Sequence, residues 1–127
     1  MRFISKLQLF FFLLVYLYMG VVKIPDDIAS GFNDLLLHGV GYGLLMLSGL
    51  FAFPNSIYLA RLVLIFFAYS FAIECIQYVL PHRSFSWLDM VANGVGLLFG
   101  ALIGYFSLPL LKLLRFDLKF VSSTKHD

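Results

Sequence analysis

The chain has 127 residues, of which 61% are hydrophobic and 13% charged, and its formal net charge is +2. A soluble domain is about 45–50% apolar and about 25% charged, so the composition excludes one and indicates a membrane protein. The length allows one domain, residues 1–127, with no room for a separate soluble catalytic domain. Basic residues near the termini set membrane topology, so we assign no nucleic-acid partner. The single cysteine, Cys75, lies in an apolar run and is expected to be buried.

The apolar residues fall into four long runs, which predict an all-α polytopic membrane protein with an antiparallel bundle of four transmembrane helices. The expected helices are about 7–22, 34–53, 57–80 and 87–111, followed by a basic cytoplasmic tail at 112–127. At about 1.5 Å per residue, each run can cross a hydrocarbon core of about 30 Å. The first run also fits a signal peptide, but no small-x-small cleavage site follows it, so we expect an uncleaved helix.

The distribution of Lys and Arg predicts the topology. One side of the membrane would receive the N-terminus, the 54–61 turn and the tail, and the other side would receive the 24–33 and 81–86 loops. The first side then holds Arg2, Lys6, Arg61, Lys112, Arg115, Lys119 and Lys125, and the second holds Lys23 and Arg83. The positive-inside rule therefore places both termini in the cytoplasm.

Polar side chains recur at helical spacing near the predicted outer ends of three helices. They are Asp34, His38 and Tyr42 in the second helix, Glu74 and Gln77 in the third, Asp89 and Asn93 in the fourth, and Arg83 in the loop before it. Hydrocarbon offers such groups no hydrogen-bond partner, so they are candidates for function. We predict that they form a ligand-binding site, in which Glu74 and His38 are the candidate catalytic residues.

Small residues predict which helices pack closely. Gly96, Gly100 and Gly104 form a stripe on one face of the fourth helix. The second helix has its own small face, made of Gly39, Gly41, Gly43 and Ser48. Close packing of these two helices would bring His38 towards Asn93.

Several of these residues also have structural interpretations. Ser86 and Asp89 fit an S-x-x-D capping box, which we weigh evenly with a ligand role for Asp89. An ion pair between Glu74 and Arg83 would explain both residues without a ligand. His38, Glu74 and Asp89 could ligate a divalent ion, but no H-E-x-x-H motif or cysteine pair supports this, so we expect no metal and no cofactor.

Two motifs carry a resemblance to a known family. Glu74-x2-Gln77-x3-Pro81-x-Arg83-x5-Asp89-x3-Asn93-x2-Gly96-x3-Gly100, preceded by Asp34-x3-His38-x3-Tyr42, resembles the VanZ-like family of small bacterial membrane proteins. The resemblance covers roughly residues 34–104 and implies a place in the bacterial cytoplasmic (inner) membrane. It also implies a link to the cell envelope and to resistance to the lipoglycopeptide teicoplanin. The chain departs from the family pattern at Leu35, where a lysine is expected, which leaves the polarity of the ligand open.

Three functions fit these observations. The favoured one is binding of the polar head group of a membrane lipid, a lipid-linked envelope precursor or a lipo(glyco)peptide, with Arg83 suited to phosphate or carboxylate. The second is an intramembrane acid/base enzyme acting on a lipid-linked substrate through Glu74 and His38, but no nucleophile accompanies that pair. The third is a structural subunit of a larger membrane complex, whose glycine stripe packs on a protein partner that the sequence does not identify.

Overall fold

The computed structural model describes residues 2–22 and 33–123, and this part of the chain is helical apart from short turns. Its elements are α1 (Arg2–Val21), α3 (Asp34–Ala52), the short 3-10 helix η1 (Ser56–Tyr58), α4 (Leu59–Val79) and α5 (Trp87–Ser123). The segments long and apolar enough to cross a membrane are Phe3–Val21, Asp34–Ala52, Leu59–Val79 and Trp87–Leu110. The prediction of an all-α bundle of four transmembrane helices is confirmed for the described residues.

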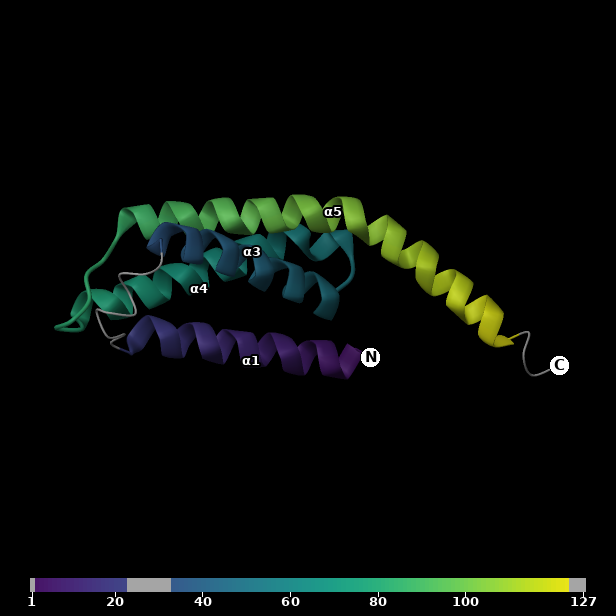
Figure 1. Ribbon diagram of the computed structural model, residues 1–127, viewed down its shortest axis with the longest axis horizontal. Helices are drawn as coiled ribbons and strands as arrows, with labels where there is room; N and C mark the ends of the chain where they lie inside the picture. Colours follow the sequence, from purple (N-terminus) through teal and green to yellow (C-terminus); the bar gives the residue numbers. More distant parts are fainter. Residues whose placement is uncertain (1, 23–32, 124–127) are drawn as a thin grey trace.

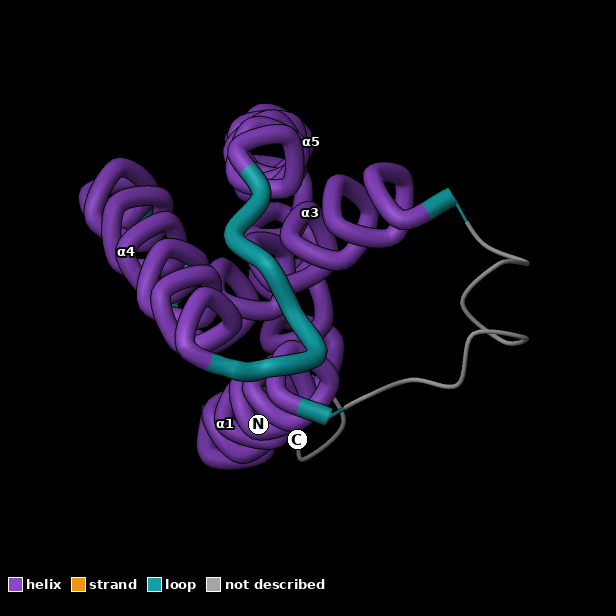
Figure 2. The backbone as a smooth tube through the Cα atoms, turned by 90° about the vertical axis from the view of Figure 1, so that its left-hand side faces the viewer, coloured by secondary structure: helices purple, strands orange, loops and turns teal. Residues whose placement is uncertain are grey.

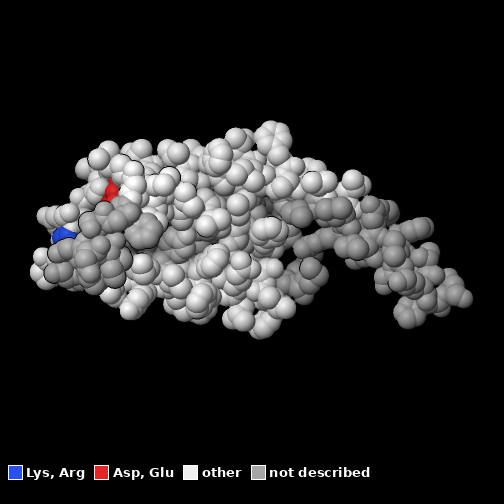
Figure 3. All heavy atoms as spheres, viewed as in Figure 1, with Lys and Arg blue, Asp and Glu red and all other residues white. Residues whose placement is uncertain are grey.

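The helices run antiparallel along the bundle. The ends of α1 and α4 and the starts of α3 and α5 lie together at one end, and the N-terminus and η1 lie at the other (Figure 1). The segment 80–86 crosses the first of these ends from α4 to α5 (Figure 2). In space-filling view, the visible charged side chains lie at this end and the middle of the face carries none (Figure 3). We call it the polar end.

Helices end where the sequence offers a cap or a breaker. The Asn33 side chain accepts the backbone N–H of Leu36 at 3.3 Å and caps α3. The Asn55 side chain accepts the N–H of Ile57 at 3.2 Å, within the turn that leads into α4. At the polar end, α4 stops two residues before Pro81, as expected because proline disfavours helix in the residue that precedes it.

Two helices extend beyond the ranges expected from hydropathy. α1 begins at Arg2 instead of near residue 7, and α5 continues to Ser123 instead of ending near residue 111. Charged residues end an apolar run without ending a helix, and no glycine or proline occurs between residues 110 and 123. Pro109 lies inside α5, which bends in this region, since proline removes one backbone donor and clashes with the preceding turn (Figure 1). Residues 24–32 of the expected 24–33 loop, and the side chains of the basic tail other than Leu113, lie outside the described residues.

The core lies where α3 meets its neighbours. Leu45 and Met46 of α3 and Leu97 of α5 are fully buried, and Phe66 of α4 packs in the same cluster. Most other large apolar side chains are exposed, as a surface surrounded by lipid requires. Because lipid tails are as apolar as leucine, close packing must hold these helices together.

Glycines allow that close packing between α3 and α5. A Cβ added at Gly96 would collide with the backbone of Gly39, and one added at Gly100 would lie 2.5 Å from the carbonyl oxygen of Gly43. Any side chain at these two positions would therefore push the helices apart.

Hydrogen bonds from tyrosines to backbone carbonyls attach α1 to the bundle. The Tyr16 hydroxyl donates to the carbonyl of Gly41 in α3 at 2.6 Å. The Tyr69 hydroxyl of α4 donates to the carbonyl of Leu13 at 2.5 Å. Interhelical hydrogen bonds of this kind stabilise membrane helix packing by about 1 kcal/mol.

The prediction that Cys75 is buried is wrong. Cys75 is exposed on α4. In a membrane bundle, the lipid-facing and core-facing sides of a helix are equally apolar, so hydropathy does not distinguish them. For the same reason, the position of Cys75 in an apolar run could not show which side it occupies.

Candidate functional site

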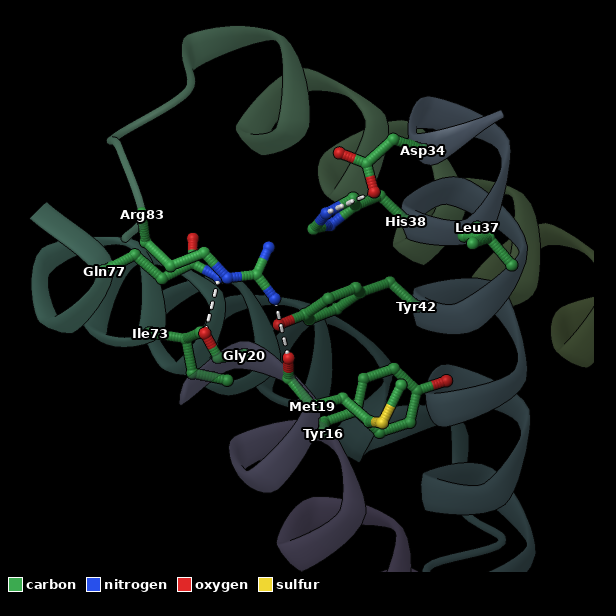
Figure 4. A pocket seen from close by; sticks show the side chains of 10 residues that line it. All are labelled: Tyr16, Met19, Gly20, Asp34, Leu37, His38, Tyr42, Ile73, Gln77 and Arg83. Atoms are coloured by element: carbon green, nitrogen blue, oxygen red, sulfur yellow. Dashed lines mark hydrogen bonds and ion pairs between the residues drawn. The ribbon is translucent and has the colours of Figure 1, made fainter. Parts of the chain in front are cut away.

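A polar pocket opens at the polar end of the bundle, between α1, α3, α4 and the loop that precedes α5 (Figure 4). Its volume is about 150 Å³. Its wall is formed by Tyr16, Met19, Gly20, Asp34, Leu37, His38, Tyr42, Ile73, Gln77 and Arg83. Predicted site residues from three different segments therefore line one cavity.

Side chains between residues 77 and 83 bond to the last carbonyls of α1. Arg83 Nη2 donates to Met19 O at 3.0 Å and to Val22 O at 3.3 Å, Gln77 Nε2 donates to Gly20 O at 3.0 Å, and His82 Nε2 lies 3.2 Å from Val21 O. The final carbonyls of a helix have no partner within the helix and carry partial negative charge. Gln77 and Arg83 thus have a structural role, which is to cap α1.

Arg83 retains binding capacity after this capping. Its guanidinium points into the pocket, towards the side that holds Tyr42 and His38 (Figure 4). Its Nε is buried and has no hydrogen-bond partner among the described residues. A buried donor without a partner is uncommon, and a water or a bound ligand would satisfy it.

Glu74 is a buried residue near the end of α4. Its residue is 1% exposed, and its Oε2 accepts the backbone N–H of Ser86 at 3.1 Å. It is not among the residues that line the pocket, and no ion pair joins it to Arg83 in the described part of the chain. Glu74 therefore attaches the start of α5 to α4, while its predicted role in ligand binding or catalysis stays a prediction.

The predicted capping box at the start of α5 is only half formed. The Ser86 hydroxyl accepts the N–H of Asp89 at 3.2 Å, as in a capping box. The reciprocal bond would join the Ser86 N–H to the Asp89 carboxylate, but Glu74 accepts that N–H instead. The Asp89 carboxylate instead lies 3.6 Å from Nε2 of His38.

His38 is the centre of a second polar group, which joins α3 to α5. Its Nδ1 lies 2.9 Å from Oδ1 of Asn93, and its Nε2 lies 3.8 Å from Oδ1 of Asp34. Asn93, 2% exposed, donates in turn from Nδ2 to the Ser70 hydroxyl at 2.6 Å. Nδ1 of His38 is thus bonded to a buried amide, while Nε2 faces two carboxylates.

The structure divides the predicted site residues into two sets. Asp34, His38, Tyr42, Gln77 and Arg83 line the pocket. Glu74, Asp89 and Asn93 do not line it: Glu74 bonds to the loop at Ser86, and Asp89 and Asn93 lie against the His38 imidazole.

The contribution of α1 to the pocket was not predicted from the sequence. Tyr16 suits an anchor at the membrane interface by its position in the chain, but it lines the cavity together with Met19 and Gly20. Its ring also packs edge to face on Tyr42, with 5.4 Å between the centroids. No charge or motif marks these positions, so only the packing of α1 could reveal them.

A family model described as VanZ/LLP1 matches the chain over residues 2–111. The matched range includes both motifs and all four membrane-spanning segments. No curated protein and no solved structure matches the chain significantly.

Proposed function

The chain belongs to the VanZ/LLP1 family, and from this premise we propose that its polar pocket binds the head group of a membrane lipid, a lipid-linked envelope precursor or a lipo(glyco)peptide. Arg83 is the observation that carries this proposal. Its guanidinium lies in the pocket wall, and its Nε is buried without a partner among the described residues. Arginine binds phosphate and carboxylate through charge-assisted hydrogen bonds, so the ligand carries one of these groups.

The size of the pocket fits a head group better than a whole ligand. Sites for drug-sized molecules are about 300–1,000 Å³, whereas this cavity measures about 150 Å³. Met19, Leu37 and Ile73 contribute apolar surface to its wall. The polar part of the ligand would enter the cavity, and its acyl chains would lie in the surrounding lipid.

We place the pocket on the outer side of a bacterial cytoplasmic membrane, with both termini in the cytoplasm. The support is the distribution of Lys and Arg, because the sequence assigns only Lys23 and Arg83 to this side and seven such residues to the other. A pocket on that side would meet lipids and lipid-linked precursors of the cell envelope. Binding there would alter susceptibility to teicoplanin-type glycopeptides, as family membership suggests.

The geometry supports the two alternative functions less well. Glu74 holds Ser86 with one carboxylate oxygen and does not line the pocket, so its position gives no support to acid/base catalysis. Gly96 and Gly100 pack against α3 within the same chain, so this part of the glycine stripe is not free to pack against a protein partner.

Lipid titrations in nanodiscs test the proposal. We expect lipids with phosphate or carboxylate head groups to bind wild-type protein, and we expect Arg83→Gln to weaken binding at least tenfold. Glutamine keeps a donor for the α1 carbonyls but loses the charge, and a hydrogen bond to a charged group contributes about 1.5–3 kcal/mol. Arg61→Gln is the matched control, because it removes the same charge from an exposed position near the opposite end of α4. Equal affinity of both variants for every anionic lipid tried would refute the proposal.

A further inference from the structure

We propose that Asp34, His38 and Asp89 form a binding site for a divalent transition-metal ion such as Zn²⁺ or Mn²⁺. Each residue offers one ligand atom, and the three atoms lie within 4.8 Å of one another. Asp34 lies in the first turn of α3, His38 lies one turn further along α3, and Asp89 lies in the first turn of α5. The metal site does not depend on the head-group proposal, because all three of its ligand atoms come from side chains of the protein.

The hydrogen bond between His38 and Asn93 determines which imidazole nitrogen carries the proton. The Asn93 amide nitrogen donates to Ser70, so its oxygen is the atom that faces Nδ1 of His38. An amide oxygen only accepts, and Nδ1 must therefore carry the proton. In the neutral ring this leaves a lone pair on Nε2, the atom 3.6 Å from Asp89 and 3.8 Å from Asp34. Metal-binding histidines are commonly oriented in this way, by a partner at the other ring nitrogen.

The bonding around Ser86 makes the Asp89 carboxylate available to a metal. In a complete capping box this carboxylate would accept the Ser86 N–H. Glu74 accepts that N–H instead, and the Asp89 side chain, 15% exposed, approaches His38. The buried Glu74 thus accepts the hydrogen bond from Ser86 that the Asp89 carboxylate would accept in a complete capping box.

Distances and charges favour a transition metal. Tetrahedral ligands at about 2.1 Å from an ion lie about 3.4 Å apart, so each carboxylate needs to approach Nε2 by less than about 0.5 Å. The ligand atoms of the two carboxylates lie within 4.8 Å of each other, so these two groups need to approach one another by up to about 1.4 Å. The Asp34 side chain is 72% exposed, so little packing hinders such a movement. Two carboxylates balance the charge of a dication, and the imidazole ligand favours Zn²⁺ or Mn²⁺ over Ca²⁺ and Mg²⁺.

This ligand set differs from the one that the sequence suggested. In the sequence, His38 and Asp89 form a possible set together with Glu74, and no metal is expected because close ligand spacing is missing. The structure supplies Asp34 as the third ligand and gives Glu74 another bond. Since Asp34 and His38 also line the polar pocket, a bound ion would lie at its wall.

Metal titration of purified, tag-free protein without added lipid tests the site. We expect one Zn²⁺ or Mn²⁺ per chain by calorimetry, and binding of Ca²⁺ at least tenfold weaker. Asp34→Asn, His38→Gln and Asp89→Asn should each weaken Zn²⁺ binding at least tenfold. Zinc X-ray absorption should report one nitrogen ligand and otherwise oxygen ligands.

Two matched variants distinguish this site from metal binding by neighbouring side chains. His82→Gln removes an exposed imidazole from the neighbouring loop, and Glu74→Gln removes the carboxylate of the alternative ligand set. Both should bind Zn²⁺ as wild type does, with circular dichroism confirming the fold of every variant. Because Asp34 is exposed, Asp34→Asn keeps the test valid even if a buried variant fails to fold. Absence of Zn²⁺ and Mn²⁺ binding in wild type, unchanged affinity in Asp34→Asn, or equal affinity for Ca²⁺ would overturn the proposal.

Discussion

Replacing Gly96 with alanine tests the close contact between α3 and α5, which brings His38 next to Asn93. A Cβ at this position would lie 2.8 Å from the carbonyl carbon of Gly39 and 3.1 Å from its Cα, and closer still to its oxygen. Backbone atoms cannot rotate away as a side chain can, so α5 must move away from α3. Gly96 lies one turn after Asn93, and Gly39 follows His38, so the movement also stretches the hydrogen bond between those side chains.

The expected cost follows from two opposing terms. Overpacking costs about 1–3 kcal/mol, and we take the upper part of this range because the obstacle is backbone. Alanine returns up to about 1 kcal/mol of helix propensity relative to glycine. Gly96→Ala should therefore lower the free energy of unfolding by about 1–2 kcal/mol.

Gly94→Ala is the matched control in the same helix. Its Cβ would lie 3.3 Å from the ring of Phe67, which can shift slightly, so this variant should be as stable as wild type or up to about 1 kcal/mol more stable. Unfolding of both variants in mixed micelles, followed by circular dichroism, measures the difference. If the two variants unfold at the same denaturant concentration, the backbones of α3 and α5 are not in contact at Gly39 and Gly96.

Three further predictions concern the polar groups and the topology. Asn93→Leu should destabilise the protein by about 2–4 kcal/mol in the same assay, because the half-buried His38 imidazole and the buried Ser70 hydroxyl each lose their hydrogen bond to Asn93; a loss below about 1 kcal/mol would contradict this. Glu74→Gln should change stability by less than about 1 kcal/mol, since the amide oxygen can accept the Ser86 N–H, whereas Glu74→Leu should cost about 1–3 kcal/mol more, and equal stabilities would show that this bond contributes little. In a background without the native cysteine, a cysteine at Ser84 should react with an impermeant maleimide in intact cells and one at Asn55 only after permeabilisation, while the reverse pattern would place the pocket on the cytoplasmic side.

The sequence was sufficient to predict the transmembrane segments but not all helix ends. Pro81 ends α4 as expected, and Asn33 caps α3, because a breaker or a cap determines the backbone locally. The start of α1 at Arg2 and the extension of α5 to Ser123 were not predicted. Hydropathy reports where a chain can leave the hydrocarbon, and a helix can continue in water beyond that point.

For the site, helical spacing could predict which residues lie at one depth but not what each one contacts. The approach of His38 to Asn93 follows from small residues on two helices. The exchange of capping partners between Asp89 and Glu74 depends on the path of the loop over the bundle end, which no local pattern specifies. Tyr16 enters the pocket only through the packing of α1, which no motif in its sequence specifies.

Native mass spectrometry of protein extracted gently from its own membrane tests the central claim most directly. Wild-type protein should retain one lipid or lipid-linked molecule with a phosphate or carboxylate head group. The Arg61→Gln variant should retain the same molecule, and Arg83→Gln should lose most of it. A wild-type protein that carries no such molecule, or equal retention by the two variants, would contradict a head-group site at the polar end.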